Sequence, residues 1–252
     1  MIDMHCHILP GIDDGAQTVE DSLALLRAEK EQGIKKIVFT PHFNPERQDL
    51  DMFLQAREKS WEALRQADGF SEMGIDTKLG CEIFFTMHLI EMDISKLAFE
   101  NTRYILIEFP TINRPYGITR TMQHILSKGY TPILAHVERY EYFTDDPVKL
   151  YDLVSLGCIA QVNAAAVVNT SHIRGVNALK YISWELAHII SSDAHSVDRR
   201  PPNTKAAYQF VEKKLGSQYR DWLVKNTRDI FNNRYFDDPI IQKPKKLLGR
   251  WR

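Results

Sequence analysis

The sequence predicts a single-domain α/β fold in which seven strand-then-helix units close into a barrel. Strand-like and helix-like segments alternate along almost the whole chain. The length of 252 residues suits one domain of this kind. Residues able to bind a metal recur near the ends of the predicted strands. Alternation of this kind is typical of a parallel sheet with helical crossovers, and a closed barrel is its economical arrangement.

The elements follow one another without an obvious break. A first strand at residues 1–9 leads through a loop to Thr18, an N-cap residue whose capping box is completed by Asp21, and Gly33 suits the end of that helix. Six further strands are predicted at 34–40, 77–84, 103–109, 131–135, 158–163 and 188–192. Helices are predicted at 51–67, 89–97, 117–127, 146–157, 176–185, 203–215 and 219–226.

The predicted barrel domain covers residues 1–238, and we find no linker or repeat that would divide it. Residues 239–252 form a basic tail containing proline, which we expect to be irregular. Its lysines and arginines are expected to be solvated, with binding to a partner protein or to an anionic membrane surface as the alternative.

Composition points to a soluble cytoplasmic protein. Hydrophobic residues make up 44% and charged residues 26% of the chain, as in ordinary globular domains. The formal net charge of −1 gives no sign of nucleic-acid binding. Cys6, Cys81 and Cys158 are too widely spaced for a disulfide framework and fit a reducing compartment. Neither a signal peptide nor a transmembrane segment is predicted.

The motif H-C-H in the first strand is the first chemical signal. Side chains alternate along a strand, so His5 and His7 are expected on one side, and Met4 and Cys6 on the other. Two imidazoles placed in this way can bind the same divalent ion. The alternative is a strand with two unrelated histidines, and the residues at later strand ends decide between these interpretations.

Nine candidate ligands lie at or just beyond the carboxyl ends of the predicted strands, where barrel active sites are built. They are His5, His7, Asp14, His42, Glu82, Glu108, His136, Asp193 and His195. Any one of them could be a loop residue or a hydrogen-bonded core histidine, which is the preferred interpretation for His88, His124, His172 and His188. Nine such groups together, if buried, must be paired or bound to cations.

Nine donors exceed the needs of one ion. Mixed imidazole and carboxylate ligands suit manganese, iron or zinc, and bridging carboxylates could hold two or three ions. Such a cluster can activate water and stabilise both oxygens of a phosphoryl displacement. We therefore predict a multinuclear metal centre with hydrolytic chemistry.

Arginines accompany the metal-binding segments. Arg139 follows His136 by three residues, and Arg199 and Arg200 follow His195. Loop arginines are usually solvated, but guanidinium groups at this place are well suited to bind phosphate. We predict phosphate binding by Arg139 and by one of the pair. Asp3 and Glu138 are predicted to orient the ligand imidazoles.

Other catalytic schemes find no support. A cysteine-based tyrosine phosphatase needs an arginine six residues after its cysteine, and Ile12, Met87 and Ala164 stand at those positions. There is no G-x-x-x-x-G-K-[ST] phosphate loop and no G-x-S-x-G nucleophile motif. Cys6 and Cys81 are expected to be small core residues.

Taken together, these motifs resemble the PHP (polymerase and histidinol phosphatase) superfamily. The resemblance rests on H-C-H at 5–7, Asp14, T-P-H at 40–42, G-C-E at 80–82, Glu108, His136 and D-A-H at 193–195. More narrowly, M-I-D-M-H-C-H-I-L-P-G-I-D-D-G, G-C-E-I, I-L-I-E-F-P, A-H-V-E-R-Y and S-S-D-A-H resemble the bacterial metal-dependent protein tyrosine phosphatases of capsule and exopolysaccharide operons. Val137 replaces a proline that is usual in that family and could alter its loop.

The resemblance implies a distorted (β/α)7 TIM-like barrel (the PHP fold) with three divalent metal ions, preferably Mn²⁺, with iron or zinc as alternatives. One ion would be held by His5, His7, Glu82 and Asp193. Glu82 would bridge to a second ion, also held by Glu108 and His136. The third would be held by Asp14, His42 and His195. Arg139 and Arg200 would bind the phosphate, with Arg200 matching the family spacing better than Arg199.

The implied reaction is hydrolysis of phosphotyrosine by a metal-bound hydroxide, in line with the leaving tyrosine oxygen and without a phosphoenzyme. The implied substrate is the phosphotyrosine tail of a cognate bacterial tyrosine autokinase that controls polysaccharide export. Such a kinase would bring the protein near the membrane without a transmembrane segment of its own. Tyr116, Tyr140, Tyr142 and Phe143 could line a groove for the substrate ring or could be ordinary loop aromatics.

Three other functions are considered. A small-molecule phosphatase such as histidinol phosphatase would use the same metals, although the opening segment favours the tyrosine phosphatases. A nuclease is disfavoured because the charge is nearly neutral and no basic stripe is evident. A non-catalytic metal-binding regulator is disfavoured because the ligand set is complete and is accompanied by arginines.

Overall fold

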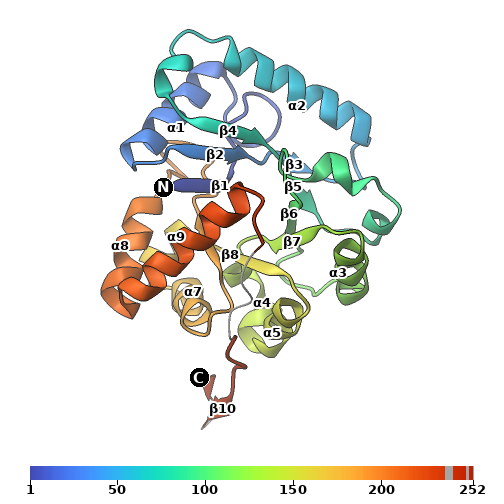
Figure 1. Cartoon of the computed structure of the whole chain (residues 1–252), viewed down its shortest axis with the longest axis vertical. Coiled ribbons are helices and arrows are strands. Elements are labelled where there is room, and N and C mark those ends of the chain that lie inside the picture. Colours follow the sequence, from blue (N-terminus) through green and yellow to red (C-terminus); the bar gives the residue numbers. More distant parts are fainter. Residues whose placement is uncertain (236–240, 248–249, 252) are drawn as a thin grey trace.

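The computed structural model describes residues 1–235, 241–247 and 250–251, and its helices surround a core of parallel strands (Figure 1). The strands of the core are β1 (Ile2–Cys6), β2 (Lys36–Phe39), β3 (His42–Phe43), β4 (Asp76–Leu79), β5 (Glu82–Phe84), β6 (Tyr104–Glu108), β7 (Thr131–Leu134), β8 (Ile159–Asn163) and β9 (Ile189–Ser191). The α-helices are α1 (Val19–Glu31), α2 (Leu50–Arg65), α3 (Ile118–Ser127), α4 (Glu141–Asp145), α5 (Val148–Ser155), α6 (Ala164–Val168), α7 (Ile173–Ser183), α8 (Thr204–Leu215) and α9 (Ser217–Phe231). Short 3₁₀ helices are η1 (Ser71–Met73), η2 (Met87–Ile90), η3 (Ile94–Leu97) and η4 (Val137–Arg139).

The strands form a distorted barrel. Among the described residues, the hydrogen-bonded orders are β1-β2-β4 and β3-β5-β6-β7-β8-β9, and every pair within them is parallel. β2 and β3 are two halves of one interrupted strand, and so are β4 and β5, which leaves seven strand positions. The ring closes where Cys6 pairs with Ala194 and the His7 N–H donates to the Ala194 carbonyl at 2.8 Å. The predicted (β/α)7 barrel is therefore confirmed.

Alternation along the strands separates an apolar interior from a polar end. An inner cluster contains buried side chains from six strands, among them Met4, Val38, Leu106, Ile133, Ile159 and Ile189. Ile230 and Phe231 of α9 pack in the same cluster and close the amino-terminal end of the barrel. Two residues further along, the same faces carry Glu108 after Leu106 and Gln161 after Ile159. The period of two thus places polar groups at the carboxyl end of the barrel.

The first strand departs from simple alternation. The register of β1 against β2 shifts between Asp3 and Cys6, as at a β-bulge. Met4 consequently packs in the inner cluster, whereas Cys6 packs in the outer cluster that contains residues of α1. The prediction that Met4 and Cys6 share a face is wrong, because the bulge adds one residue between them. His5 and His7 nevertheless converge.

Most element ends agree with the sequence to within a few residues. The capping box of α1 is present, because the Thr18 hydroxyl accepts from the Asp21 N–H at 3.1 Å and the Asp21 carboxylate accepts from the Thr18 N–H at 3.0 Å. The predicted helix at 89–97 is instead the two 3₁₀ helices η2 and η3. Helices α4 and α6 were not predicted, since five residues each are too few to show a helical period.

The tail is only partly irregular. The predicted domain boundary at 238–239 lies outside the described residues, but β10 (Lys246–Leu247) and β11 (Arg250–Trp251) form a short antiparallel pair. The Trp251 indole N–H donates to the Asp145 carbonyl at 3.0 Å, and the Gln242 N–H donates to the Trp184 carbonyl at 3.1 Å. These bonds anchor the described part of the tail to the barrel. Within the described residues, every helix is too short or too polar to span a bilayer.

We expect His188 to make folding stability fall with acid. Burial lowers the pKa of His188 from 6.5 to about 3, and its Nδ1 accepts a hydrogen bond from the Ala160 N–H at 3.0 Å. Between these two values the unfolded chain binds a proton that the folded chain does not, so stability decreases as pH falls below 6.5, by up to about 1.4 kcal/mol per pH unit. His188→Asn retains an acceptor for Ala160 and should flatten this slope in urea denaturation at pH 7, 6 and 5. Equal slopes for both proteins would contradict the assignment.

Candidate metal centre

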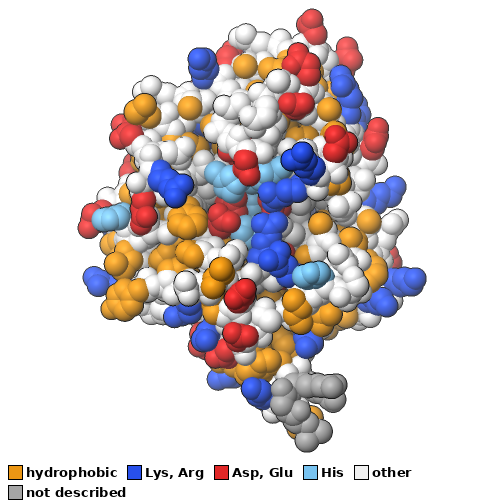
Figure 2. Space-filling view, turned by 180° about the vertical axis from the view of Figure 1, so that it is seen from behind, with side chains coloured by type: hydrophobic (Ala, Val, Ile, Leu, Met, Phe, Trp, Pro, Cys, Tyr) orange, Lys and Arg blue, Asp and Glu red, His pale blue; other side chains and the backbone are white. Residues whose placement is uncertain are grey.

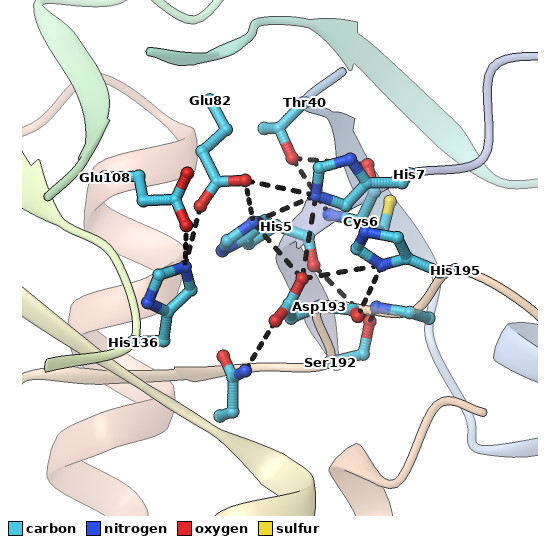
Figure 3. Close-up of polar contacts among 12 residues, drawn as sticks. His5, Cys6, His7, Thr40, Glu82, Glu108, His136, Ser192, Asp193 and His195 are labelled. Carbon is cyan, nitrogen blue, oxygen red and sulfur yellow. Dashed lines mark hydrogen bonds and ion pairs between the residues drawn. The ribbon is translucent and has the colours of Figure 1, made fainter. Parts of the chain in front are cut away.

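The nine predicted ligands lie together at the carboxyl end of the barrel. Figure 3 labels all of them except Asp14 and His42. His5 lies on β1 and His7 just beyond it, His42 on β3, Glu82 on β5 and Glu108 at the end of β6. The other four lie on the loops that follow β1, β7 and β9: Asp14, His136, Asp193 and His195. Histidine, acidic and basic side chains gather at the centre of this face (Figure 2).

Four of these side chains converge on one point. His5 Nε2 and His7 Nε2 are 3.2 Å apart, and Glu82 Oε2 lies 3.2 Å from the first and 3.3 Å from the second. Asp193 Oδ1 lies 3.6 Å from both nitrogens. Ligands 2.0–2.2 Å from a tetrahedrally bound ion are about 3.4 Å from one another. The spacing therefore fits the first shell of a divalent cation.

The tautomers of the two histidines support the same conclusion. Gln161 Oε1 accepts from the His136 N–H at 2.8 Å, so the atom 3.1 Å from His5 Nδ1 is an oxygen and His5 Nδ1 donates to it. Asp13 Oδ2 accepts from the His42 N–H at 3.0 Å and lies 2.8 Å from His7 Nδ1. In the neutral imidazoles both Nε2 atoms then present lone pairs. Two lone pairs and two carboxylate oxygens facing one another require a shared positive charge.

The remaining ligands continue the cluster on both sides. His136 Nε2 lies 2.9 Å from Glu82 Oε1 and 3.4 Å from Glu108 Oε1. On the other side, Asp14 Oδ1 lies 3.3 Å from His42 Nε2 and 3.5 Å from His195 Nε2. His42 Nδ1 also lies 3.0 Å from Glu82 Oε2 and links this part of the cluster to the centre. The nine side chains thus form one continuous set of donors.

Three buried atoms of the cluster lack hydrogen bonds. In the described part of the chain, Glu82 Oε2, His136 Nδ1 and His195 Nε2 are buried without a hydrogen-bond partner. Such atoms in a folded protein call for an explanation, and a bound ion is one of the ordinary ones. Together with the converging lone pairs, they show that this donor set fits divalent cations.

The pKa values of the ligand histidines also indicate that the cluster binds positive charge. Burial lowers the pKa of His7, but the nearby carboxylates of Asp13 and Glu82 raise it by more, to about 10. The pKa of His136 is raised to about 9, because its hydrogen bonds with Glu108 and Glu82 outweigh the effect of burial. Burial next to the charge of His7 lowers the pKa of His195 to about 3. In the metal-free protein, protons bound to His7 and His136 would supply part of the positive charge that the cations otherwise provide.

Local backbone geometry fixes the ligands. A Cβ atom on Gly15 would lie 2.1 Å from the His7 carbonyl oxygen, so only glycine lets the D-D-G loop fold against His7 and bring Asp13 to its ring. His136 and Asp193 have positive φ angles of 31° and 53°, an unfavourable conformation for these residues. Backbone strain of this kind is often retained at functional sites.

Two arginines reach the cluster. Arg139 Nη2 lies 2.8 Å and Arg200 Nη2 lies 2.6 Å from Asp193 Oδ2. Arg199 makes no such contact among the described residues, and its backbone N–H donates to Ser196 Oγ at 3.0 Å. The structure therefore places Arg139 and Arg200, rather than Arg199, beside the donor set.

The chain as a whole is similar to known proteins. The family model described as capsular polysaccharide synthesis, CpsB/CapC, matches residues 1–232. The chain belongs to the CpsB/CapC family. It is 32% identical to the tyrosine-protein phosphatase YwqE of Bacillus subtilis (strain 168), over 99% of each chain. It is also 32% identical to the tyrosine-protein phosphatase CpsB of Streptococcus pneumoniae, over 91% of this chain and 98% of that protein.

Solved structures of the CpsB/CapC family agree with the fold. A crystal structure reported for YwqE from Bacillus subtilis and CpsB from Streptococcus pneumoniae, described as unique metal-dependent tyrosine phosphatases, matches with a TM-score of 0.87. The match has 29% identity and covers 97% of this chain and 100% of that chain. The phosphotriesterase from Mycobacterium tuberculosis matches with a TM-score of 0.53 at 14% identity, over 93% of this chain and 95% of that chain, and shares the fold alone.

The prediction that Asp3 and Glu138 orient ligand imidazoles is wrong. Asp3 Oδ1 accepts from the Ser192 N–H at 2.9 Å, and its other oxygen accepts from the Ser192 hydroxyl, so Asp3 fixes the loop before Asp193 instead. Both Glu138 oxygens lie 3.4 Å from the Asn163 N–H. Side-chain direction explains the difference, since neither carboxylate faces the ring nitrogens.

Sequence reasoning missed the groups that do orient the imidazoles. These are Gln161 and Asp13, and Asn163 Nδ2 likewise donates to Asp193 Oδ2 at 2.6 Å. A signal was present, because Gln161 and Asn163 are polar residues two apart on an otherwise apolar strand. Polar residues at that spacing face the barrel interior next to the ligands.

Of the two interpretations left open for the four aromatic residues, a substrate groove or ordinary packing, the structure favours packing for three. Tyr140, Tyr142 and Phe143 are buried and pack against one another. The Tyr140 hydroxyl accepts from the Phe109 N–H at 2.9 Å, so that ring supports the strand carrying Glu108. Only Tyr116, with 87% of its surface exposed, remains available to a substrate.

The other sequence features have structural roles. Val137 begins η4, the first helical position, where proline and other residues are both tolerated, and His136 keeps its place in the cluster. Cys6, Cys81 and Cys158 are buried free thiols. Burial raises the pKa of the Cys81 thiol to about 12, so this group is not a thiolate at neutral pH.

We expect Gln161→Leu to weaken metal binding by about 10- to 100-fold, the usual cost of losing a group that orients a ligand imidazole. Leucine is of similar size but removes the acceptor for His5 Nδ1 and for the His136 N–H. Titration of metal-stripped protein with Mn²⁺, followed by isothermal calorimetry, measures the change. Gln161→Glu retains the acceptor and should bind the metal more tightly than Gln161→Leu; the reverse order would contradict the role.

Proposed function

We propose that this chain is a metal-dependent protein tyrosine phosphatase whose active site is the cluster at the carboxyl end of the barrel. Membership of the CpsB/CapC family and the names of its relatives support the reaction. The observation that carries the proposal is the position of two guanidinium groups at the edge of a cation-binding donor set, both on Asp193 Oδ2. Guanidinium groups beside divalent cations are suited to bind a phosphoryl group.

The nine side chains would hold three divalent ions, with Mn²⁺ as the first choice and iron or zinc as alternatives. His5, His7, Glu82 and Asp193 are suited to one ion by their spacing. Glu82 would share the second with Glu108 and His136, and Asp14, His42 and His195 would hold the third. When bound, these ions supply Lewis acidity that activates water and offsets phosphoryl charge.

The protein's own groups bind and orient the substrate. Arg139 and Arg200 would grip the phosphoryl oxygens and stabilise the negative charge that they carry during transfer. Asp193, Gln161 and Asp13 hold the arginines and imidazoles in place before the substrate arrives. Such preorganisation lowers the reorganisation cost of the reaction. No thiol takes part, so no covalent phosphoenzyme is needed.

The proposed physiological substrate is the phosphotyrosine tail of a cognate bacterial tyrosine kinase, and the proposed role is regulation of capsular or exopolysaccharide synthesis in the cytoplasm. The family description, capsular polysaccharide synthesis, supports this setting. Contact with such a kinase would bring the protein near the membrane. Nucleic acid is not a proposed partner, because the net charge is −1.

The proposal is tested by phosphate release from metal-stripped protein resupplied with Mn²⁺. A phosphotyrosine peptide, histidinol phosphate and single-stranded DNA are compared side by side. Preference for the peptide, lost again on chelation, is the expected result. Preference for histidinol phosphate would make the protein a small-molecule phosphatase, nuclease activity would overturn the charge argument, and inactivity on all three would favour a metal-binding regulator.

Cys6→Ser should retain most of this activity. Cys6 is fully buried beside the ligands, and its Sγ donates weakly to the Val38 carbonyl at 3.5 Å, a bond that serine can make. Steady-state kinetics with the phosphotyrosine peptide, together with circular dichroism to check the fold, measure the effect. Loss of activity in a folded protein would show that the thiol takes part and that the metal-based mechanism is wrong.

A further inference from the structure

Beside the metal centre lies a second pocket, of about 260 Å³, which we name the side pocket. Arg139 lines it and also contacts Asp193, so the side pocket begins where the proposed phosphate site ends. Asn169, His172 and Arg174 line its outer part, between α6 and the start of α7. Figure 2 shows basic side chains continuing from the histidine-rich centre of this face towards its edge.

The walls of the side pocket are fixed by close packing. A Cβ atom on Gly175 would lie 2.2 Å from the Asn169 carbonyl oxygen, so α7 approaches the end of α6 as closely as glycine permits. The His172 N–H donates to the same carbonyl at 3.2 Å. A preformed pocket of this size matches one amino-acid side chain rather than a large ligand.

The polar groups of the side pocket that are free to bind a ligand are mainly hydrogen-bond donors. Asn169 Oδ1 already accepts from the Ser171 hydroxyl at 2.6 Å, which leaves the Asn169 amide nitrogen to bind a ligand. The Asn163 amide is fully used, because its nitrogen donates to Asp193 and its oxygen accepts from Gln161. The Glu138 carboxylate is 1% exposed and both its oxygens face the Asn163 N–H. An anionic group is therefore the complementary ligand.

Arg174 supplies the charge. It is exposed, and among the described residues no carboxylate lies within 4.0 Å of its guanidinium group, in contrast to Arg139 and Arg200. An arginine without a carboxylate partner gives the outer part of the side pocket a positive charge, whereas the charge of Arg139 is already paired with Asp193. A carboxylate that enters the pocket would find both charge and hydrogen-bond donors.

We propose that the side pocket binds an acidic side chain, aspartate or glutamate, that flanks the phosphotyrosine of the protein substrate, and that Arg174 determines this specificity. The inference rests on the proposed phosphatase function, because Arg139 joins the two sites. A small aryl phosphate has no flanking residue and would not use the pocket. Selection of acidic neighbours would let the enzyme distinguish one phosphotyrosine sequence from another.

The test compares two phosphotyrosine peptides that differ only in glutamate or glutamine beside the phosphotyrosine, with p-nitrophenyl phosphate as the substrate without a flank. For the Mn²⁺-loaded protein we expect a lower KM for the glutamate peptide. Arg174→Gln should raise that KM by about three- to tenfold, because it removes a charge-assisted hydrogen bond that is partly exposed to solvent. The value of kcat should not change, because this bond stabilises the bound substrate and the transition state equally. Hydrolysis of the glutamine peptide and of p-nitrophenyl phosphate should not change.

Arg120→Gln is the matched control. Arg120 on α3 is also exposed, has no carboxylate within 4.0 Å among the described residues, and lines a different pocket. The Arg120→Gln variant should still hydrolyse the glutamate peptide with a lower KM than the glutamine peptide. Arg174→Glu should reverse the preference, towards a peptide with lysine at the flanking position, and so keeps the test decisive if Arg174→Gln has a small effect.

Binding of the labelled peptides to metal-stripped protein, followed by fluorescence anisotropy, separates this inference from the proposed function. If no phosphotyrosine substrate is hydrolysed but the glutamate peptide binds more tightly and Arg174→Gln removes the difference, the phosphatase proposal fails and the side pocket stands. If the wild-type protein shows no preference in KM or binding, or if Arg174→Gln and Arg120→Gln change it equally, the side-pocket proposal is wrong.

Discussion

Glu82→Gln should lower phosphate release from a phosphotyrosine peptide by about 10³-fold, equivalent to about 4 kcal/mol of transition-state stabilisation. The Glu82 carboxylate is the hub of the cluster, because its two oxygens lie 2.9–3.3 Å from nitrogens of four histidines. Glutamine removes one negative charge and turns an N–H donor towards imidazole lone pairs. Both changes oppose cation binding, so we expect the variant to lose metal as well as activity.

Metal content by inductively coupled plasma mass spectrometry and initial rates at saturating Mn²⁺ measure this effect. The control is Cys81→Ser, at the position that immediately precedes β5. Cys81 is fully buried, and its Sγ contacts the Leu97 carbonyl at 3.4 Å on the opposite side of the strand. This variant should keep both metal and rate. A Glu82→Gln protein with normal metal content and activity would remove Glu82 from the proposed site.

The barrel and the positions of the nine donors could be predicted because both depend on local periodicity. Alternation along a strand and the convergence of parallel strand ends are enough to bring residues as distant as His5, Glu108 and Asp193 to one place. The bulge in β1 is not visible in such a pattern, since it depends on how β1 pairs with β2. It changed the neighbours of Met4 without changing the convergence of His5 and His7.

The direction of polar side chains was harder to predict than their position. Asp3 and Glu138 lie near the ligands in sequence but do not face them, since they contact Ser192 and Asn163 instead. Gln161 reaches His5 from β8, two strands away around the barrel. Whether an aromatic side chain is buried or exposed was equally hard to predict. Tyr140 follows a ligand segment, yet its ring is buried and its hydroxyl supports the backbone of Phe109. Burial of a loop residue depends on tertiary packing, which periodicity does not report.

Arg200→Gln should lower kcat for the phosphotyrosine peptide by about 10²- to 10³-fold, the typical cost of removing one group that stabilises transition-state charge. Arg200 Nη2 contacts Asp193 Oδ2 at 2.6 Å, so its guanidinium group is held at the edge of the donor set. Glutamine cannot supply the charge or a bidentate pair of donors. Steady-state kinetics that separate kcat from KM, with metal content measured in parallel, show whether the loss lies in the chemical step.

The neighbouring arginine is the appropriate control, because Arg199 and Arg200 have the same chemistry and adjacent positions. Arg199 is exposed, and within the described residues its guanidinium group has no carboxylate within 4.0 Å, whereas that of Arg200 contacts Asp193. Arg199→Gln should therefore leave kcat within about twofold of the wild-type value, as is usual for an exposed residue without specific contacts. If Arg199→Gln causes the larger loss, the loop after β9 rearranges when substrate binds, and the phosphate ligand is Arg199 rather than Arg200.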